Sequence, residues 1–393
     1  MFLKARAGGA APRSHVLAAL SEDGRREAER VICALPGYQP TPLVALPALA
    51  QARGVAALHV KDEGRRFHLT SFKALGGAYA VVSMVLAEAG KRLGRTVEPD
   101  EIASGEIRAA ARDLTFCCAT DGNHGRSVAW GAQLAGATCR IFIHAGVSAG
   151  REAAMAALGA VMTRIDGSYD DSVALAAREA EKNGWIVVSD TAWPGYEDIP
   201  LTVMQGYTVM TAEALDALAE APTHIFVQAG VGGMAASVAA YAKCRFGPAR
   251  PKIVVVEPAR AACLHESARQ DRLVTIPHGE PTVMAMLECA TPSPLGWEVL
   301  RHLADGYMTL DENEAIDAMR LLAGPAADDP IVVAGESGGT GLAGFLQCMS
   351  DRRAREHLGL DGKSRILVFN SEGATDPDIY RSIVGRAPDR VSA

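Results

Sequence analysis

The chain has 393 residues, of which 49% are hydrophobic and 22% are charged, and its formal net charge at pH 7 is −7. This length predicts two or more domains, and the composition is that of an ordinary soluble enzyme. The mild negative charge and the lack of a polybasic cluster argue against a nucleic-acid or anionic-membrane partner. No apolar run reaches the length of a bilayer span and residues 1–6 lack a secretory signal, so we expect a cytoplasmic protein.

The eight cysteines are scattered, with no C-x-x-C pair and no histidine at zinc spacing, so we expect no metal site. In a reducing compartment such cysteines mostly fill the core. Cys263 and Cys289 both lie near predicted loops, and the sequence leaves open whether they pair.

The most informative residue among the first 90 is Lys73. After a short helix (25–32), a proline-rich extended segment (36–43), a strand (56–62) and a loop (63–70), the chain reads Ser71-Phe72-Lys73-Ala74-Leu75-Gly76-Gly77. We expect Ser71 to cap a helix that carries Lys73 in its first turn and stops at Gly90. A cation gains nothing from the positive end of a helix dipole, which favours a chemical role such as a Schiff base. On this stretch alone, a solvated surface lysine remains the commoner case.

Strands and helices then alternate twice along the chain. The first series has strands 114–119, 138–144, 161–165 and 185–189 with helices 124–135, 149–158 and 170–182. After a long helix (201–218), the second series has strands 224–228, 253–257, 331–334 and 365–369 with helices 233–245, 261–269, 312–322 and 339–350. Residues 273–297 contain several prolines and predict an ordered loop over a site or a subunit contact. This alternation predicts an α/β fold with two open, mostly parallel sheets flanked by helices and a ligand cleft between them.

Ligands of such sheets bind at the carboxyl ends of the strands, so the residues that follow each strand are the candidates. Asp121-Gly122-Asn123-His124-Gly125 follows one strand, and its glycines let a ring-shaped ligand approach while Asn123 supplies a hydrogen bond, although Asp121 or Asn123 could equally be a helix cap. Asp190 follows another strand and could likewise be only a cap or turn residue.

Two further strand ends are rich in glycine or hydroxyl groups. Gly230-Val231-Gly232-Gly233-Met234 precedes a helix and suits a phosphate, with close packing as an equal alternative. Gly335–Gly341 could form a second wall, and Ser371 follows the last strand. A lysine, a phosphate site, an amide for a phenolic oxygen and a hydroxyl for a ring nitrogen together describe pyridoxal 5'-phosphate.

On these motifs the chain resembles the β-family (fold type II) of pyridoxal-phosphate enzymes, the group of tryptophan synthase β and the serine/threonine dehydratases. Asp121 ahead of the Gly-Asn-His motif and the Ser189-Asp190 pair resemble the diaminopropionate ammonia-lyases within it. The resemblance implies that Lys73 is the Schiff-base lysine. It also implies that Gly230, Val231, Gly232, Gly233 and Met234 hold the phosphate, Asn123 the phenolic oxygen and Ser371 the ring nitrogen.

The resemblance further implies α,β-elimination of D- and L-2,3-diaminopropionate to pyruvate and two ammonia. The two isomers present their α-hydrogen on opposite faces and need two bases, for which we choose Lys73 and Asp121, with Asp190 receiving the β-ammonium. We expect a homodimer with a large cofactor-binding domain (1–85 and 215–393) and a small mobile domain (86–214). His68, in the approach to the lysine, stands where the family pattern suggests glycine, which leaves the exact amino acid open.

The alternatives lie on the same fold or outside it. A serine/threonine-type dehydratase, a lyase for another β-substituted alanine and a β-replacement synthase share the cofactor. An inactive ligand-binding protein is disfavoured because Lys73, both aspartates and the glycine loop are all present. A dinucleotide oxidoreductase is disfavoured because the glycine loop lacks the full spacing and no acidic residue is placed for a ribose.

Overall fold

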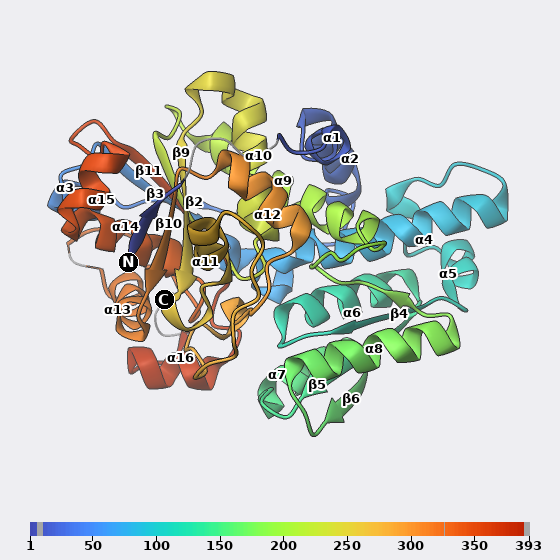
Figure 1. Cartoon of the computed structure of the whole chain (residues 1–393). Helices are drawn as coiled ribbons and strands as arrows, with labels where there is room; N and C mark the ends of the chain where they lie inside the picture. The colour runs from blue at the N-terminus through green and yellow to red at the C-terminus, as the bar shows by residue number, and fades with distance from the viewer. Residues whose placement is uncertain (6–10, 326, 389–393) are drawn as a thin grey trace. The chain divides into compact units, whose positions relative to one another are not determined.

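The computed structural model describes residues 1–5, 11–325 and 327–388, and the chain divides into two compact units. Unit 1 comprises Met1–Asp23, Pro40–Phe72 and Met210–Ala393, and unit 2 comprises Gly24–Gln39 and Lys73–Val209. Each unit combines strands and helices from segments that are distant in the sequence (Figure 1). Lys73 is the first residue of a unit 2 segment.

Unit 1 contains a seven-stranded sheet in the order β1-β10-β9-β8-β11-β3-β2. The five inner strands are parallel, and the edge strands β1 and β2 pair antiparallel. The nearly continuous burial of β8 and β9 is typical of parallel strands covered on both faces. The strands are β1 (Phe2–Lys4), β2 (Leu43–Ala45), β3 (Ala57–Asp62), β8 (His224–Gln228), β9 (Lys252–Pro258), β10 (Gly306–Leu310) and β11 (Arg365–Asn370).

The helices of unit 1 pack around a core that includes Val60, Phe226, Val254, Leu342 and Phe345. They are α1 (Ser14–Ala19), α3 (Pro47–Arg53), α10 (Gly233–Phe246), α11 (Cys263–Gln270), α12 (Pro294–Leu303), α13 (Glu312–Ala323), α14 (Thr340–Ser350), α15 (Arg352–Leu358) and α16 (Pro377–Val384). Short 3-10 turns are η1 (Glu63–Arg65), η2 (Phe67–Leu69), η5 (Gly247–Ala249), η6 (Ala259–Ala261) and η7 (Ala285–Leu287).

Unit 2 contains a four-stranded parallel sheet in the order β6-β5-β4-β7, formed by β4 (Thr115–Ala119), β5 (Thr138–His144), β6 (Val161–Ile165) and β7 (Ile186–Val187). Its helices are α4 (Gly77–Leu93), α5 (Gly105–Ala111), α6 (Asn123–Ala135), α7 (Ala149–Ala156) and α8 (Tyr169–Asn183), with the turn η4 (Pro99–Glu101). Helices α2 (Glu22–Ile32) and α9 (Asp198–Ala217) and the turn η3 (Phe72–Leu75) contribute residues to both units.

The predicted fold class is confirmed, because both sheets are mostly parallel and both are accompanied by helices. Five of the eight cysteines are buried, and none of the eight, all of which lie within the described residues, is in a disulfide. The described residues also contain no group of three or more histidines, cysteines, aspartates or glutamates that could hold a metal ion.

Three local predictions were wrong. The lysine helix does not begin at Ser71, because Phe72–Leu75 form a 3-10 turn and α4 starts at Gly77 and continues to Leu93. Residues 331–334 form no strand among the described residues, because the Val332 N–H bonds to Leu322 O at the end of α13 instead of to a neighbouring strand. The proline-containing segment is not all loop, because Pro294 occupies the first turn of α12, where its missing N–H costs nothing.

Among the described residues, one segment, Phe72–Leu93, could cross a membrane by length and composition alone, contrary to the expectation from the sequence. However, 72% of its most apolar window is buried inside the protein, as in a core helix.

Candidate functional site

The backbone of Lys73 is fixed by a hydroxyl group of α6. Ser127 Oγ donates a hydrogen bond to Lys73 O at 2.7 Å and accepts one from Ala78 N at 2.8 Å, so one side chain ties the turn η3 to the start of α4. Gly76 is required for close packing, because a Cβ atom there would lie 2.5 Å from the Tyr207 ring. The glycines after the lysine therefore serve close approach between helices of unit 2.

The Lys73 side chain lies against Asp190. Its Nζ donates a hydrogen bond to Asp190 Oδ2, and both side chains are less than one-fifth exposed. Burial alone would raise the pKa of Asp190, but the positive charge of Lys73 and its hydrogen bond to the carboxylate outweigh burial and hold this pKa well below its usual range. The structure thus brings together two of the predicted catalytic residues, as an ion pair within unit 2.

His124 completes this corner of unit 2. Its Nε2 lies 2.8 Å from Val188 O and therefore carries the ring proton. Burial lowers the pKa of His124, which favours the neutral ring. Nδ1 then accepts, and among the described residues it has no hydrogen-bond partner although it is buried. An unpartnered buried acceptor beside the lysine fits a site built for a ligand.

The turn that carries Asp121 and Asn123 is capped by a residue that the sequence analysis missed. Thr120 Oγ1 accepts hydrogen bonds from Gly122 N at 3.1 Å and Gly125 N at 3.2 Å, so Thr120 stabilises the turn in place of Asp121 or Asn123. Asn123 is the first residue of α6 and is buried. Asp121 is partly exposed, and its Oδ1 lies 2.6 Å from His144 Nε2.

In unit 1, the glycine loop leads from β8 into α10. Gly232 has φ +98°, a left-handed conformation that favours glycine, and within the described residues no side chain caps α10. The first N–H groups of α10 are therefore available to an anion. The start of α12 packs on the loop, because Ser293 N, at the N-cap of this helix, bonds to Val231 O at 2.9 Å and a Cβ atom on Gly296 would meet the same oxygen at 3.1 Å.

Ser371 follows β11 and is buried beside Gln228, another residue that the sequence analysis missed. Gln228 Nε2 lies 2.9 Å from Ser371 Oγ, 2.9 Å from Gly338 O and 3.0 Å from Phe369 O. The carbonyl oxygens identify this atom as the amide nitrogen, which only donates. The hydroxyl hydrogen of Ser371 therefore points elsewhere and is available to an acceptor.

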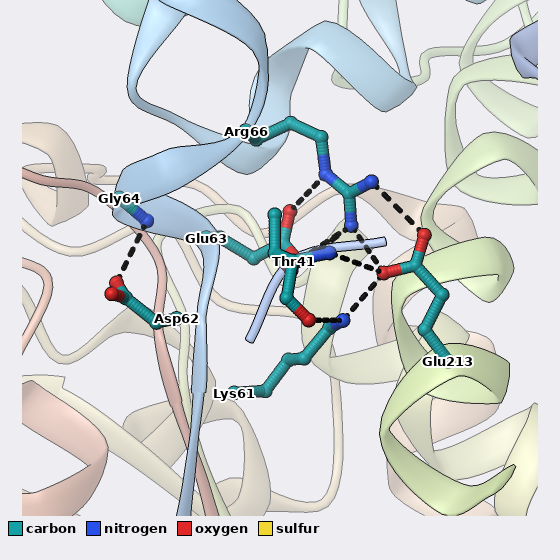
Figure 2. A network of polar contacts seen from close by, with 7 residues as sticks. All are labelled: Thr41, Lys61, Asp62, Glu63, Gly64, Arg66 and Glu213. Carbon is teal, nitrogen blue, oxygen red and sulfur yellow. Dashed lines mark hydrogen bonds and ion pairs between the residues drawn. The ribbon is translucent and has the colours of Figure 1, made fainter. Parts of the chain in front are cut away.

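The segment ahead of Lys73 is held in unit 1 by a buried charge cluster, which consists of Thr41, Lys61, Glu63, Arg66 and Glu213 (Figure 2). Arg66 is fully buried and donates to Glu63 at 2.8 Å and to Glu213 at 2.6 and 2.9 Å. Lys61 Nζ contacts Glu213 at 2.5 Å and Thr41 O at 2.7 Å. Desolvation would lower the pKa of Arg66, yet the two carboxylates raise it. The charges of two cationic and two anionic side chains therefore neutralise one another within the core.

The segment after this cluster has an unusual backbone. Phe67 and Thr70 have φ values of +47° and +53°, in a region that residues other than glycine rarely adopt. Thr70 O then accepts from Gly373 N at 2.9 Å, and Phe72 N donates to Ser371 O at 3.1 Å. Ser71 forms an isolated antiparallel β-bridge with Glu372 and does not cap a helix. The predicted site residues Lys73, Asp121, Asn123 and Asp190 belong to unit 2, whereas Gly230–Met234 and Ser371 belong to unit 1.

Comparison with known proteins gives consistent matches. Residues 34–372 match the family described as pyridoxal-phosphate dependent enzyme. The chain is 39% identical over 357 residues to diaminopropionate ammonia-lyase of Escherichia coli K12, with 89% of this chain and 88% of that protein covered.

Solved structures agree with this result. The crystal structure of the Escherichia coli diaminopropionate ammonia-lyase in complex with D-serine has a TM-score of 0.89 and 34% identity, covering 98% of this chain and 96% of that chain. Its complex with an aminoacrylate-PLP azomethine reaction intermediate has a TM-score of 0.87 and 35% identity over the same shares of the two chains.

Proposed function

Because the chain belongs to the pyridoxal-phosphate-dependent enzyme family, we propose that it eliminates ammonia from D- and L-2,3-diaminopropionate and, with the uptake of one water molecule, releases pyruvate and a second ammonia. The observation that carries this proposal is the Asp190 carboxylate beside the Lys73 amine. A carboxylate with a low pKa at this place offers a partner to an amino leaving group, which a hydroxy-amino-acid dehydratase would not require.

The cofactor, when bound, supplies an electron sink that makes the α-hydrogen of an amino acid acidic. Lys73 would bind the cofactor covalently and Asn123 would bond its phenolic oxygen. The uncapped start of α10 supports a phosphate site, which we assign to Gly230, Val231, Gly232, Gly233 and Met234. Ser371, whose hydroxyl hydrogen is available, would donate to the ring nitrogen, and a neutral hydroxyl at that position would moderate the electron sink and favour β-elimination.

Two bases serve the two isomers. Lys73 takes the α-proton from one face of the substrate and Asp121 from the other, while Asp190 holds the β-ammonium before it leaves. Asp121 is partly exposed, as a group that meets a substrate must be, and it lies on a different strand end from Asp190.

The test is the release of pyruvate by the purified protein from D-diaminopropionate, L-diaminopropionate and L-serine. We expect both isomers of diaminopropionate to react faster than serine. Lys73→Ala should abolish the activity and the absorption band of the bound cofactor. Lys91→Ala, which changes an exposed lysine at the other end of α4, should abolish neither. Faster turnover of L-serine would instead identify a dehydratase.

We also propose that the protein acts in the cytoplasm as a homodimer without nucleic-acid or membrane partners, consistent with its mild net charge. The assignment of a large cofactor-binding domain (1–85 and 215–393) and a small mobile domain (86–214) stays a prediction. Size-exclusion chromatography with light scattering tests the dimer.

A further inference from the structure

We propose that His144 is a positioning residue for Asp121, and that it thereby sets the relative rates on D- and L-diaminopropionate. This inference rests on the proposed function, in which Asp121 is the base for one isomer. It is carried by the hydrogen bond between the two side chains and by the groups that fix the imidazole ring.

The parallel sheet of unit 2 brings the two residues together. Strands β4 and β5 are neighbours, with Ala119 opposite Phe142. Asp121 and His144 each lie two residues farther along the chain, so both emerge at the carboxyl edge of the sheet. His144 Nε2 lies 2.6 Å from Asp121 Oδ1, and the side chains are 24% and 28% exposed. The pair is thus accessible to a small molecule.

The backbone determines which ring nitrogen of His144 carries the proton. Gly146 N donates a hydrogen bond to His144 Nδ1 at 3.2 Å, so Nδ1 is an acceptor and the proton resides on Nε2. A second proton on Nδ1 would face the Gly146 N–H and lose this bond. The ring is therefore held as a neutral donor to one oxygen of Asp121, which leaves the other oxygen for the α-proton.

The neighbours of His144 restrain its backbone and its ring. Arg164, on β6, donates to the carbonyl oxygens of His144 and Ala145 at 3.2 and 3.1 Å and pairs with Glu152 at 2.6 Å. Tyr169 packs edge-on against the imidazole, with 6.4 Å between the ring centroids. A ring that cannot swing away fixes the carboxylate that it bonds, and misplacement of a catalytic group by about 1 Å can cost roughly 100-fold in rate.

The experiment compares kcat and KM on the two isomers for three variants. His144→Leu removes the donor, and His144→Gln keeps an N–H donor at a similar reach. Gly146→Ala retains His144 but adds a Cβ atom 2.9 Å from its Cε1, which must displace the ring. Cofactor absorption of each variant reports folding and loading independently of activity.

We expect His144→Leu and Gly146→Ala each to change the ratio of the two isomer rates by roughly tenfold, through kcat and not KM. In His144→Gln, which keeps an N–H donor, the ratio of the two isomer rates should stay within about threefold of the wild-type ratio. Gly150→Ala is the matched control, because nothing lies nearer to its added Cβ atom than Ser148 Oγ at 3.9 Å.

Three results would overturn the inference: an unchanged ratio in cofactor-loaded His144→Leu, an equal loss on both isomers, or no rescue by glutamine. If His144→Leu fails to fold, an unchanged ratio in cofactor-loaded Gly146→Ala would overturn the inference instead. A failure of the proposed function is distinguishable, because the wild-type protein itself would then leave one or both isomers unreacted.

Discussion

Replacement of Arg66 by methionine tests the buried charge cluster. The change keeps most of the side-chain volume but leaves the carboxylates of Glu63 and Glu213 in the core with Lys61 as the remaining cation of the cluster. Breaking a buried ion pair by removing one partner costs about 3–5 kcal/mol. At about 2–4 °C per kcal/mol for a large domain, we expect Tm to fall by roughly 6–20 °C.

The neighbouring arginine provides the control. Arg65 is 61% exposed and contacts Asp62 at 3.4 Å, so Arg65→Met should cost less than about 1 kcal/mol. Thermal unfolding is measured by fluorescence on the cofactor-free proteins, so that ligand binding does not contribute to Tm. Equal shifts for the two variants, or a more stable Arg66→Met, would refute the view that the cluster depends on charge balance.

Two further predictions concern a carboxyl group and a glycine. Burial raises the pKa of Glu257 from 4.5 to about 8, although Leu264 N and His265 N donate to it. The folded chain therefore keeps a proton that the unfolded chain releases, so this stabilisation is complete below the unfolded pKa of 4.5 and is lost as the pH rises through 8. Tm should fall across this window in the wild type and fall less in Glu257→Gln; parallel curves would contradict this. Gly206→Ala, on α9, should lower stability by about 1–3 kcal/mol in chemical denaturation, because its Cβ atom would collide with the backbone carbonyl of Leu75. Gly150→Ala, in α7, should instead stabilise by up to about 1 kcal/mol through helix propensity; a stabilising Gly206→Ala would contradict the packing argument.

The sequence predicted those features that depend on local pattern. The alternation of strands and helices predicted two mostly parallel sheets, because a strand such as β8 has an apolar centre and is followed by glycine and a helical period. It missed the inner strand β10. Lys73 and Asp190, 117 residues apart, were identified from separate motifs, and the structure pairs them.

The residues that were missed act through neighbours in space. His144 was part of a correctly predicted strand, but its relation to Asp121 depends on the register between β4 and β5. Gln228 is the last residue of β8, and its contact with Ser371 depends on the pairing of β8 with β11. Ser71 has the side chain of a helix cap, but its bridge with Glu372 prevails over local propensity.

The division of the chain into interrupted segments has a consequence for folding. Strand β3 is made early in synthesis, yet its inner neighbour β11 lies near the other end of the chain, and the Asp62–Asn370 hydrogen bond joins residues 308 positions apart. All segments of unit 2 precede residue 210, so unit 2 can fold on the ribosome while the sheet of unit 1 still lacks four of its seven strands. We therefore expect the lysine-bearing unit to form first, with completion of the larger sheet as the slow step.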